Sequence, residues 1–279
     1  MPPTRVTRWK QFALLIAGAS VAVGGSQAAV ATVDTTAGRA ETAATAQAGA
    51  YDDTYYQDAE GKSGQELKDA LHGIISDQTK LSYSEVWDAL KVTDEDPANA
   101  SNVVLLYTGR SQSKSDNGGD ADQWNREHVW AKSHGDFGTA TGPGTDVHHL
   151  RPTDVTVNSD RGNKDFDEGG TESDEAPGNF TDSDSWEPRD EVKGDVARMI
   201  FYMAVRYEGG DGFADLEVND EVSNGSAPLM GRVSVLREWH EQDPPDAFEE
   251  NRNQVIFDQF QHNRNPFIDH PEWVASIWS

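Results

Sequence analysis

Residues 125–166 read NREHVWAKSHGDFGTATGPGTDVHHLRPTDVTVNSDRGNKDF, and this stretch decides the centre of the fold. It holds four of the eight histidines. Residues 124–130 alternate well enough to predict a strand, and the glycine-rich residues 133–145 predict a loop. Residues 147–150 are then expected to be extended. Thr153 or Asp154 could cap a helix that runs through Asn158.

On either side of this stretch, most apolar residues have the spacing that is typical of amphipathic helices. Residues 63–66 and 82–85 each form a Ser-x-x-Glu capping box before apolar residues at helical spacing. Further helices are expected over residues 196–207 and 229–239, and after Pro244-Pro245. NVVLLY, residues 102–107, predicts a buried strand, whereas residues 111–122 and the acidic run 167–190 predict loops. The predicted fold class is α+β, a mostly helical single domain around a small sheet.

The N-terminal residues predict export. Residues 1–31 have a basic start, an apolar run and small residues at a cleavage site, which together indicate a signal peptide. A membrane anchor is the alternative, but the apolar run is shorter than the ~20 residues that a span needs. Residues 32–52 are rich in Ala and Thr and predict a disordered propeptide or linker. The expected domain is therefore residues 53–279, in a secreted, extracellular protein without contact to a membrane.

Composition restricts how this domain is stabilised and what it can bind. The chain has no cysteine, so no disulfide can form, and its formal net charge is −26. Such a charge keeps a secreted protein soluble and argues against unaided binding to nucleic acid or anionic lipid. A polyanionic substrate would have to meet a local basic site or a bridging metal. We expect a monomer.

The central stretch combines the residue types that metal-assisted phosphodiester hydrolysis needs. Glu127 and Asn158 offer the hard oxygen ligands that magnesium, manganese or calcium prefers. A neutral imidazole such as His128 could take a proton from water. The cationic groups of Arg151, Arg161 and Lys164 could hold a phosphate. The alternative is a purely structural role, in which the charged groups form surface ion pairs and the histidines line a polar loop.

One geometric difficulty concerns Glu127 and His128. Adjacent residues of a regular strand point to opposite faces, so both cannot face one phosphate from it. Either the strand is twisted or bulged at this point, or one of the two residues lies at its end. The sequence leaves these possibilities open.

Three motifs, NREHVWAKS, DVHHLRP and VNSDRGNKDF, resemble the Endonuclease I family of secreted and periplasmic bacterial nucleases. The cysteine-free extracellular branch is closest in character. SYSEVWDAL, NVVLLYTGRS, ARMIFYMAVRYEG, LREWHEQDPPD and NRNPFIDHPEW extend the resemblance to roughly residues 55–275.

The resemblance implies a ββα-metal nuclease motif with one divalent ion, Mg²⁺, with Mn²⁺ or Ca²⁺ as alternatives. It implies that His128 is the general base and that Glu127 and Asn158 hold the metal, while Arg161 braces the phosphate. Where the family often has asparagine, this chain has His149, so the role of that residue stays open. The residues expected to contact substrate are Arg126, His149, Arg151, Asn163 and Lys164.

The expected activity is largely sequence-nonspecific cleavage of DNA or RNA or both, because contacts to phosphate carry no base code. Two alternatives remain. One is a zinc hydrolase of peptide or ester bonds with His128, His148 and His149 as ligands, although the chain has no H-E-x-x-H helix. The other is a non-catalytic nucleic-acid-binding module, which the net charge disfavours.

Overall fold

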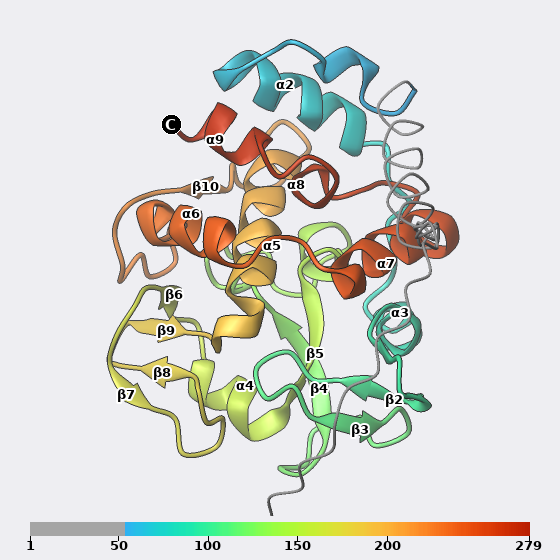
Figure 1. Cartoon of the computed structure of the whole chain (residues 1–279), viewed down its shortest axis with the longest axis vertical. Coiled ribbons are helices and arrows are strands. Elements are labelled where there is room, and N and C mark those ends of the chain that lie inside the picture. The colour runs from blue at the N-terminus through green and yellow to red at the C-terminus, as the bar shows by residue number, and fades with distance from the viewer. Residues whose placement is uncertain (1–53) are drawn as a thin grey trace, which may run out of the picture. The chain divides into compact units, whose positions relative to one another are not determined.

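The structure is a computed structural model that describes residues 54–279 (Figure 1). These residues belong to one compact unit. The predicted signal peptide and linker lie outside the described residues. Within residues 54–279, no helix has both the length and the apolar character needed to cross a membrane.

Helices make up most of the regular structure in the described part of the chain. The α-helices are α2 (Gly64–Ile75), α3 (Glu85–Thr93), α4 (Val155–Arg161), α5 (Lys193–Arg206), α6 (Val233–Gln242), α7 (Ala247–Val255), α8 (Pro266–Asp269) and α9 (Trp273–Ile277). The other helical turns are η1 (Gln57–Ala59), η2 (Pro143–Thr145), η3 (Asp190–Val192) and η4 (Ile256–Phe260).

The strands form several small sheets rather than the one small sheet predicted. Their bounds are β1 (Glu95–Asp96), β2 (Asn99–Val104), β3 (Ser111–Ser113), β4 (Trp124–His128), β5 (Leu150–Asp154), β6 (Asp165–Phe166), β7 (Thr171–Glu172), β8 (Phe180–Thr181), β9 (Ser185–Glu187), β10 (Glu217–Val218) and β11 (Leu229–Met230). The sheet orders are β1-β2-β3, β4-β5, β6-β9-β8-β7 and β10-β11.

The acidic run 167–190, predicted to be loop, contributes three short strands to one of these sheets. Its single tryptophan, Trp186, is fully buried in the main core and fixes β9 beside β6. The strands have only two or three residues each. Such short strands carry no periodic pattern that a sequence analysis could detect. The prediction of a plain loop was therefore wrong for this run.

Helix α5 forms the centre of the molecule, with α2, α6 and α8 packed around it (Figure 1). All of its residues are buried. Its apolar side chains fill the main core, and its charged groups have partners. Arg198, for example, pairs with Glu249 of α7. A helix buried on every side therefore tolerates polar residues because each finds a partner.

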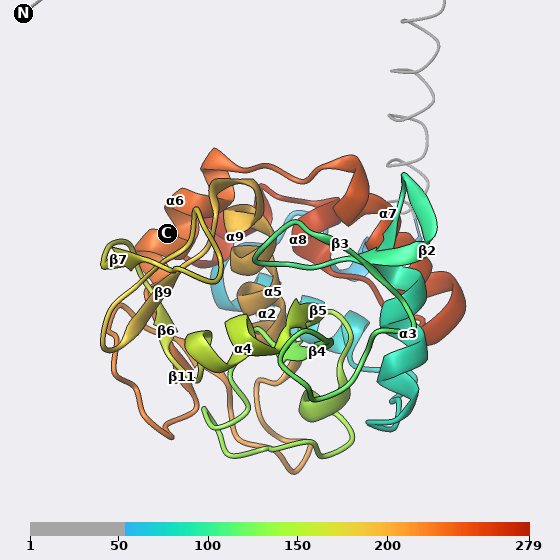
Figure 2. The same cartoon turned by 90° about the horizontal axis from the view of Figure 1, so that it is seen from below.

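Strands β4 and β5 and helix α4 follow one another around the glycine-rich loop. The two strands pair antiparallel without a bulge, from Trp124 opposite Asp154 to His128 opposite Leu150. Asp154 Oδ1 accepts the backbone N–H groups of Thr156 and Val157, at 2.8 and 3.3 Å, and so caps α4 as predicted. Seen from below, α4 lies beside both strands (Figure 2).

A cluster of buried charges fixes β5 from behind. Arg151 on β5 donates from Nε to Asp94 Oδ1 at 2.5 Å and from Nη1 to Asp195 Oδ2 at 3.1 Å. Arg252 of α7 donates to the same Asp94 carboxylate at 3.3 Å and to the carbonyl oxygens of Val147 and Leu150. Asp94 ends α3 and Asp195 lies on α5, so the cluster joins four elements.

A second buried carboxylate, Asp146, holds the loop that leads into β5. It accepts hydrogen bonds at 2.9 Å from Gln78, Tyr202, Tyr207 and Gln261. Burial alone would raise the pKa of Asp146, but the nearby His148 and the hydrogen bond from Gln261 hold that pKa below its usual value. The loop is thereby tied to α5 and to the C-terminal segment.

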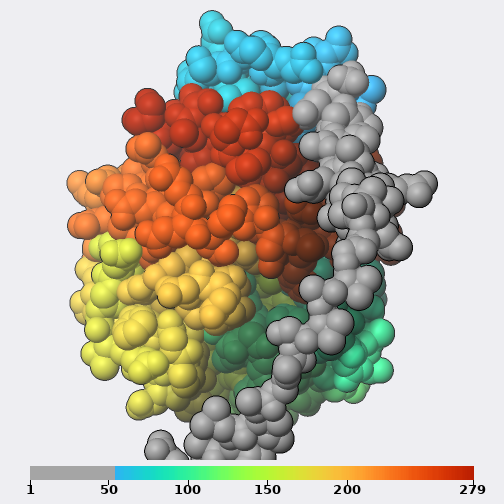
Figure 3. Space-filling view, in the orientation of Figure 1, coloured from blue at the N-terminus to red at the C-terminus, as the bar shows by residue number. Residues whose placement is uncertain are grey.

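The first and last described segments also meet. Tyr56 donates a hydrogen bond to Asp269 at 2.7 Å, and its ring packs edge-on against Trp273. The space-filling view shows the blue N-terminal segment directly beside the red C-terminal one (Figure 3). Helix α9 also packs against α2.

We predict that Asp146→Asn lowers the free energy of unfolding by about 3 kcal/mol, because two or more buried donors lose a charged acceptor. Urea unfolding near neutral pH would measure the loss. The matched control is Asp88→Asn, whose side chain is 85% exposed and which should change stability little.

The same pair of proteins gives a pH test. A folded-state pKa below the unfolded value adds stability above the unfolded pKa, and this is lost as pH falls through the folded pKa. The difference between wild type and Asp146→Asn should therefore shrink as pH falls below about 4. A difference that stays constant with pH would contradict an ionised Asp146 in the native protein.

Candidate active site

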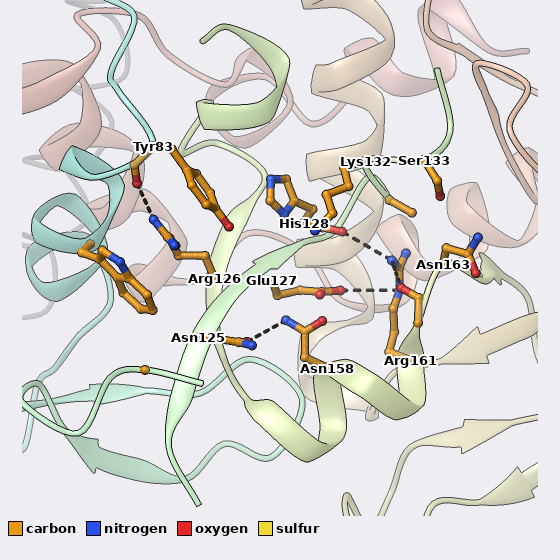
Figure 4. Close-up of a pocket in the computed structure, with 14 residues that line it drawn as sticks. Tyr83, Asn125, Arg126, Glu127, His128, Lys132, Ser133, Asn158, Arg161 and Asn163 are labelled. Carbon is orange, nitrogen blue, oxygen red and sulfur yellow. Dashed lines mark hydrogen bonds and ion pairs between the residues drawn. The ribbon is translucent and has the colours of Figure 1, made fainter. Parts of the chain in front are cut away.

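A cavity of about 500 Å³ lies along β4 and α4 (Figure 4). Six of the nine predicted site residues line it, and His149, Arg151 and Lys164 do not. The lining residues are Tyr83, Trp87, Gly118, Asn125, Arg126, Glu127, His128, Ala131, Lys132, Ser133, Asn158, Arg161, Gly162 and Asn163.

Glu127 presents one carboxylate oxygen to the protein and leaves the other available. Oε1 accepts a hydrogen bond from the Tyr107 hydroxyl at 2.9 Å and lies 3.5 Å from Arg161 Nε. Within residues 54–279, no side chain donates a hydrogen bond to Oε2, and the backbone N–H of His128 is the other group near the carboxylate that lowers its pKa. Burial raises the pKa of Glu127, and the Arg161 charge and the Tyr107 hydrogen bond act against that rise. Interactions with the protein thus compensate only in part for the hydration that this carboxylate loses on burial.

Asn158 on α4 turns its amide oxygen toward Glu127 (Figure 4). Its Nδ2 donates to Asn125 Oδ1 at 2.7 Å, so the orientation of the amide is fixed. The Asn158 oxygen accepts no hydrogen bond from any described residue. An available carboxylate oxygen and an amide oxygen thus face each other from β4 and α4.

His128 has a defined tautomer. Its Nε2 lies 3.1 Å from the carbonyl oxygen of Gly144, which can only accept, so Nε2 carries the proton. Nδ1 is then an acceptor, and no described group donates to it. Burial, followed by the neighbouring His149, lowers the pKa of His128 well below its usual value. The imidazole is therefore neutral and has one free lone pair.

The position of His128 resolves the difficulty raised by its neighbour Glu127. β4 runs without a bulge, and His128 is its last residue. The chain leaves the sheet at this residue, and both side chains line the cavity. Of the possibilities left open by the sequence, the end of the strand is the one realised.

His149 and His148 are buried and serve the protein interior. His149 donates from Nε2 to the carbonyl oxygen of Pro143 at 2.7 Å, and its Nδ1 accepts the backbone N–H of Trp130 at 3.3 Å. His148 lies against the Tyr202 ring, with Nε2 3.1 Å from Asn263 Oδ1. Burial lowers the pKa of each to about 4. His149 therefore connects the loop before β5 to the chain that follows β4.

Two of the predicted phosphate-binding cations lie outside the cavity lining. Arg151 is fully buried in the charge cluster behind β5. Lys164 donates from Nζ to the Asp160 carbonyl at 3.0 Å and to the Thr181 hydroxyl at 2.5 Å. Their positive charges are used within the protein, so neither enters the proposed substrate site.

Arg126 lies in the cavity wall between two aromatic rings. Its guanidinium carbon is 3.4 Å from the centre of the Tyr83 ring and 4.0 Å from that of Trp87. Tyr83 in turn stacks toward His128, with ring centres 5.9 Å apart. Tyr83 and Trp87 come from the α3 region, about 40 residues before β4. Both lie in the family-like segment SYSEVWDAL, but nothing in that segment associated them with the site. Sequence reasoning likewise missed Asn125, Lys132 and Ser133, although all three lie in the NREHVWAKS motif.

The donor set suits one hard divalent ion and does not suit zinc held by histidines. In the described part of the chain, no group of three or more His, Cys, Asp or Glu side chains could hold a metal ion. His148 and His149 are engaged elsewhere, so the three-histidine zinc site is not formed. Glu127 and Asn158 would supply two oxygen ligands and leave the other positions to water and phosphate, as hard ions accept.

The chain belongs to the Endonuclease I family, whose sequence model matches residues 63–272. It is 70% identical over 226 residues to a protein of Bacillus amyloliquefaciens named extracellular ribonuclease. It is 69% identical over 226 residues to the protein of that name from Bacillus subtilis (strain 168). Each comparison covers 81% of this chain and 78% of the relative. The family predicted from the motifs is thus confirmed.

Family membership settles the class of protein. This chain is a nuclease, an enzyme that hydrolyses phosphodiester bonds. The alternatives of a peptide or ester hydrolase and of a non-catalytic binding module are therefore excluded.

Proposed function

We propose that this protein is a secreted endonuclease that hydrolyses RNA with the help of one divalent ion, Mg²⁺ by preference. The observation that carries the proposal is the arrangement of His128, whose free Nδ1 lies in the same cavity as the oxygen pair of Glu127 and Asn158. RNA is the first substrate because both relatives are named extracellular ribonuclease. The same names and the signal-like residues 1–31 support secretion.

DNA is expected to be cut as well. The cavity-lining groups suited to a nucleic acid are cations, amides and a metal site, all of which address phosphate. Phosphate contacts do not read base sequence, and discrimination between RNA and DNA requires contacts to the 2′-hydroxyl. Cleavage without strict sequence preference follows.

The chemistry is divided among few groups. His128 Nδ1 accepts a proton from the water that attacks phosphorus, and its hydrogen bond to Gly144 keeps the ring in that orientation. Glu127 and Asn158 would hold the ion, which when bound supplies positive charge to the phosphate and the leaving oxygen. Burial keeps His128 neutral and ready to accept a proton at neutral pH. Arg161, which projects from α4 like Asn158, forms an ion pair with Glu127 (Figure 4).

The direct test is incubation of the purified protein with structured RNA and with supercoiled plasmid DNA, each with magnesium, manganese, calcium, zinc or chelator. We expect cleavage of both substrates with magnesium or manganese and none with chelator. Circular dichroism with chelator checks that the fold persists. Full activity in chelator would contradict the proposed metal dependence, and cleavage of RNA alone would limit the substrate to RNA.

The general base is tested by His128→Ala, which should lower the cleavage rate by roughly two to four orders of magnitude. Added imidazole should restore part of the loss. His262→Ala is the matched control, because His262 is exposed and lies outside the cavity lining. If His128→Ala keeps more than about a third of the wild-type rate, another group is the base.

The metal ligands are tested by calorimetric titration with manganese. Glu127→Ala and Asn158→Ala should weaken binding at least about tenfold, since even groups that only orient metal ligands contribute that much. Asn125→Ala should weaken it less, because Asn125 orients the amide of Asn158. His128→Ala should bind manganese like the wild type. Equal affinities in all four variants would exclude this site.

A further inference from the structure

Three cationic side chains line the cavity, namely Arg126, Lys132 and Arg161. Cleavage of a phosphodiester builds negative charge on the phosphate, and a positioned cation stabilises that charge. The protein as a whole repels a polyanion, since its formal net charge is −26. Which of the three cations is available to substrate therefore matters for the reaction.

The guanidinium of Arg161 is occupied by the protein. The side chain is fully buried, and Nη2 donates to the carbonyl oxygen of Val129 at 2.7 Å. Nη1 donates to the carbonyl oxygens of His128 and Gly162 at 3.4 and 3.3 Å, whereas Nε lies 3.5 Å from Glu127 Oε1 and makes no hydrogen bond within the described residues. Arg161 thus fixes the end of β4 and one metal ligand.

Arg126 is also held. Its guanidinium lies between the Tyr83 and Trp87 rings, and Nη1 donates to the Tyr83 carbonyl oxygen. Withdrawal from these contacts would expose two aromatic rings and leave a carbonyl unpaired. Arg126 can offer its remaining N–H groups, including a buried Nε that has no partner among the described residues, only from a fixed position.

Lys132 differs from both arginines. It is exposed, and within residues 54–279 its ammonium has no ion pair or hydrogen bond. Its backbone is held in place by the hydrogen bonds from His134 N–H to the Ala131 carbonyl and from Gly138 N–H to the Lys132 carbonyl. An anchored backbone and an unengaged ammonium suit a group that binds a ligand.

Lys132 lines the same cavity as the proposed catalytic groups Glu127 and His128. Next to it, the hydroxyl oxygen of Ser133 is buried, lines the cavity and has no partner among the described residues. A buried hydroxyl without a partner is unusual and is satisfied when a ligand supplies an acceptor.

Given the nuclease function proposed above, we propose that Lys132 is the catalytic cation that contacts the scissile phosphate, with Ser133 as a neutral second donor. As the water oxygen bonds to phosphorus and the bond to the leaving sugar oxygen breaks, charge grows on the non-bridging oxygens. The Lys132 ammonium donates hydrogen bonds to those oxygens and loses no proton. Arg161 is then a positioning residue, contrary to the role that the motif implied.

The test compares Lys132→Ala, Lys132→Arg and Ser133→Ala with wild type on a short RNA. Lys132→Ala should lower kcat about 100-fold, the usual effect of removing one such donor, and change KM little. Lys132→Arg should recover at least part of the loss because it keeps the charge. Ser133→Ala should lower kcat by a smaller factor. Manganese affinity and the urea midpoint should stay at wild-type values in all three variants.

The matched control is Lys62→Ala, which removes the same charge from an exposed position outside the cavity lining. Its kcat should equal that of the wild type. If Lys132→Ala matches this control, or raises KM alone, Lys132 is not a catalytic residue. A kcat that falls in His128→Ala but not in Lys132→Ala would overturn the role of Lys132 and leave the nuclease mechanism intact.

Discussion

The arrangement of the site depends on the salt-bridge cluster of Asp94, Arg151, Asp195 and Arg252. Buried charges are tolerated only when they are paired, and removal of one partner typically costs 3–5 kcal/mol. Because Arg151 projects from β5, the cluster determines where that strand lies relative to α3, α5 and α7. β5 in turn pairs with β4, whose last residues carry the proposed catalytic groups. Because the chain has no cysteine, ion pairs and the hydrophobic core stabilise the fold, whereas disulfides contribute to this in many exported enzymes.

The sequence predicted those helices that are determined by local features, namely a capping residue and apolar residues at helical spacing. At the start of α3, Ser82 and Glu85 make both capping-box hydrogen bonds. Asp154 caps α4, and α5 covers nearly the whole predicted stretch 196–207. The predicted strand at residues 102–107 lies instead at Asn99–Val104, because its last three residues turn into the core after the sheet has ended. Boundaries of this kind depend on tertiary packing, which a local pattern does not contain.

The sequence predicted those residues of the candidate site that lie in the recognised family motifs. Glu127, His128 and Asn158 were named from residue chemistry and family resemblance, and all three line one cavity. Arg151 illustrates the limit. A basic residue inside a motif looks the same whether its partner is a phosphate or a carboxylate, and its partner Asp94 lies 57 positions earlier. Tyr83 is a second example, since only folding brings it against His128.

The charge cluster also has a consequence for the order of events during synthesis. Arg252 is close to the end of the chain, and the contacts of Tyr56 with Asp269 and Trp273 join the first and last described segments. Contacts so distant in sequence form late, after the intervening chain is available. The support that holds β5 behind the cavity therefore needs residues from both the first and the last described segments, and it can assemble only after Arg252 has been synthesised.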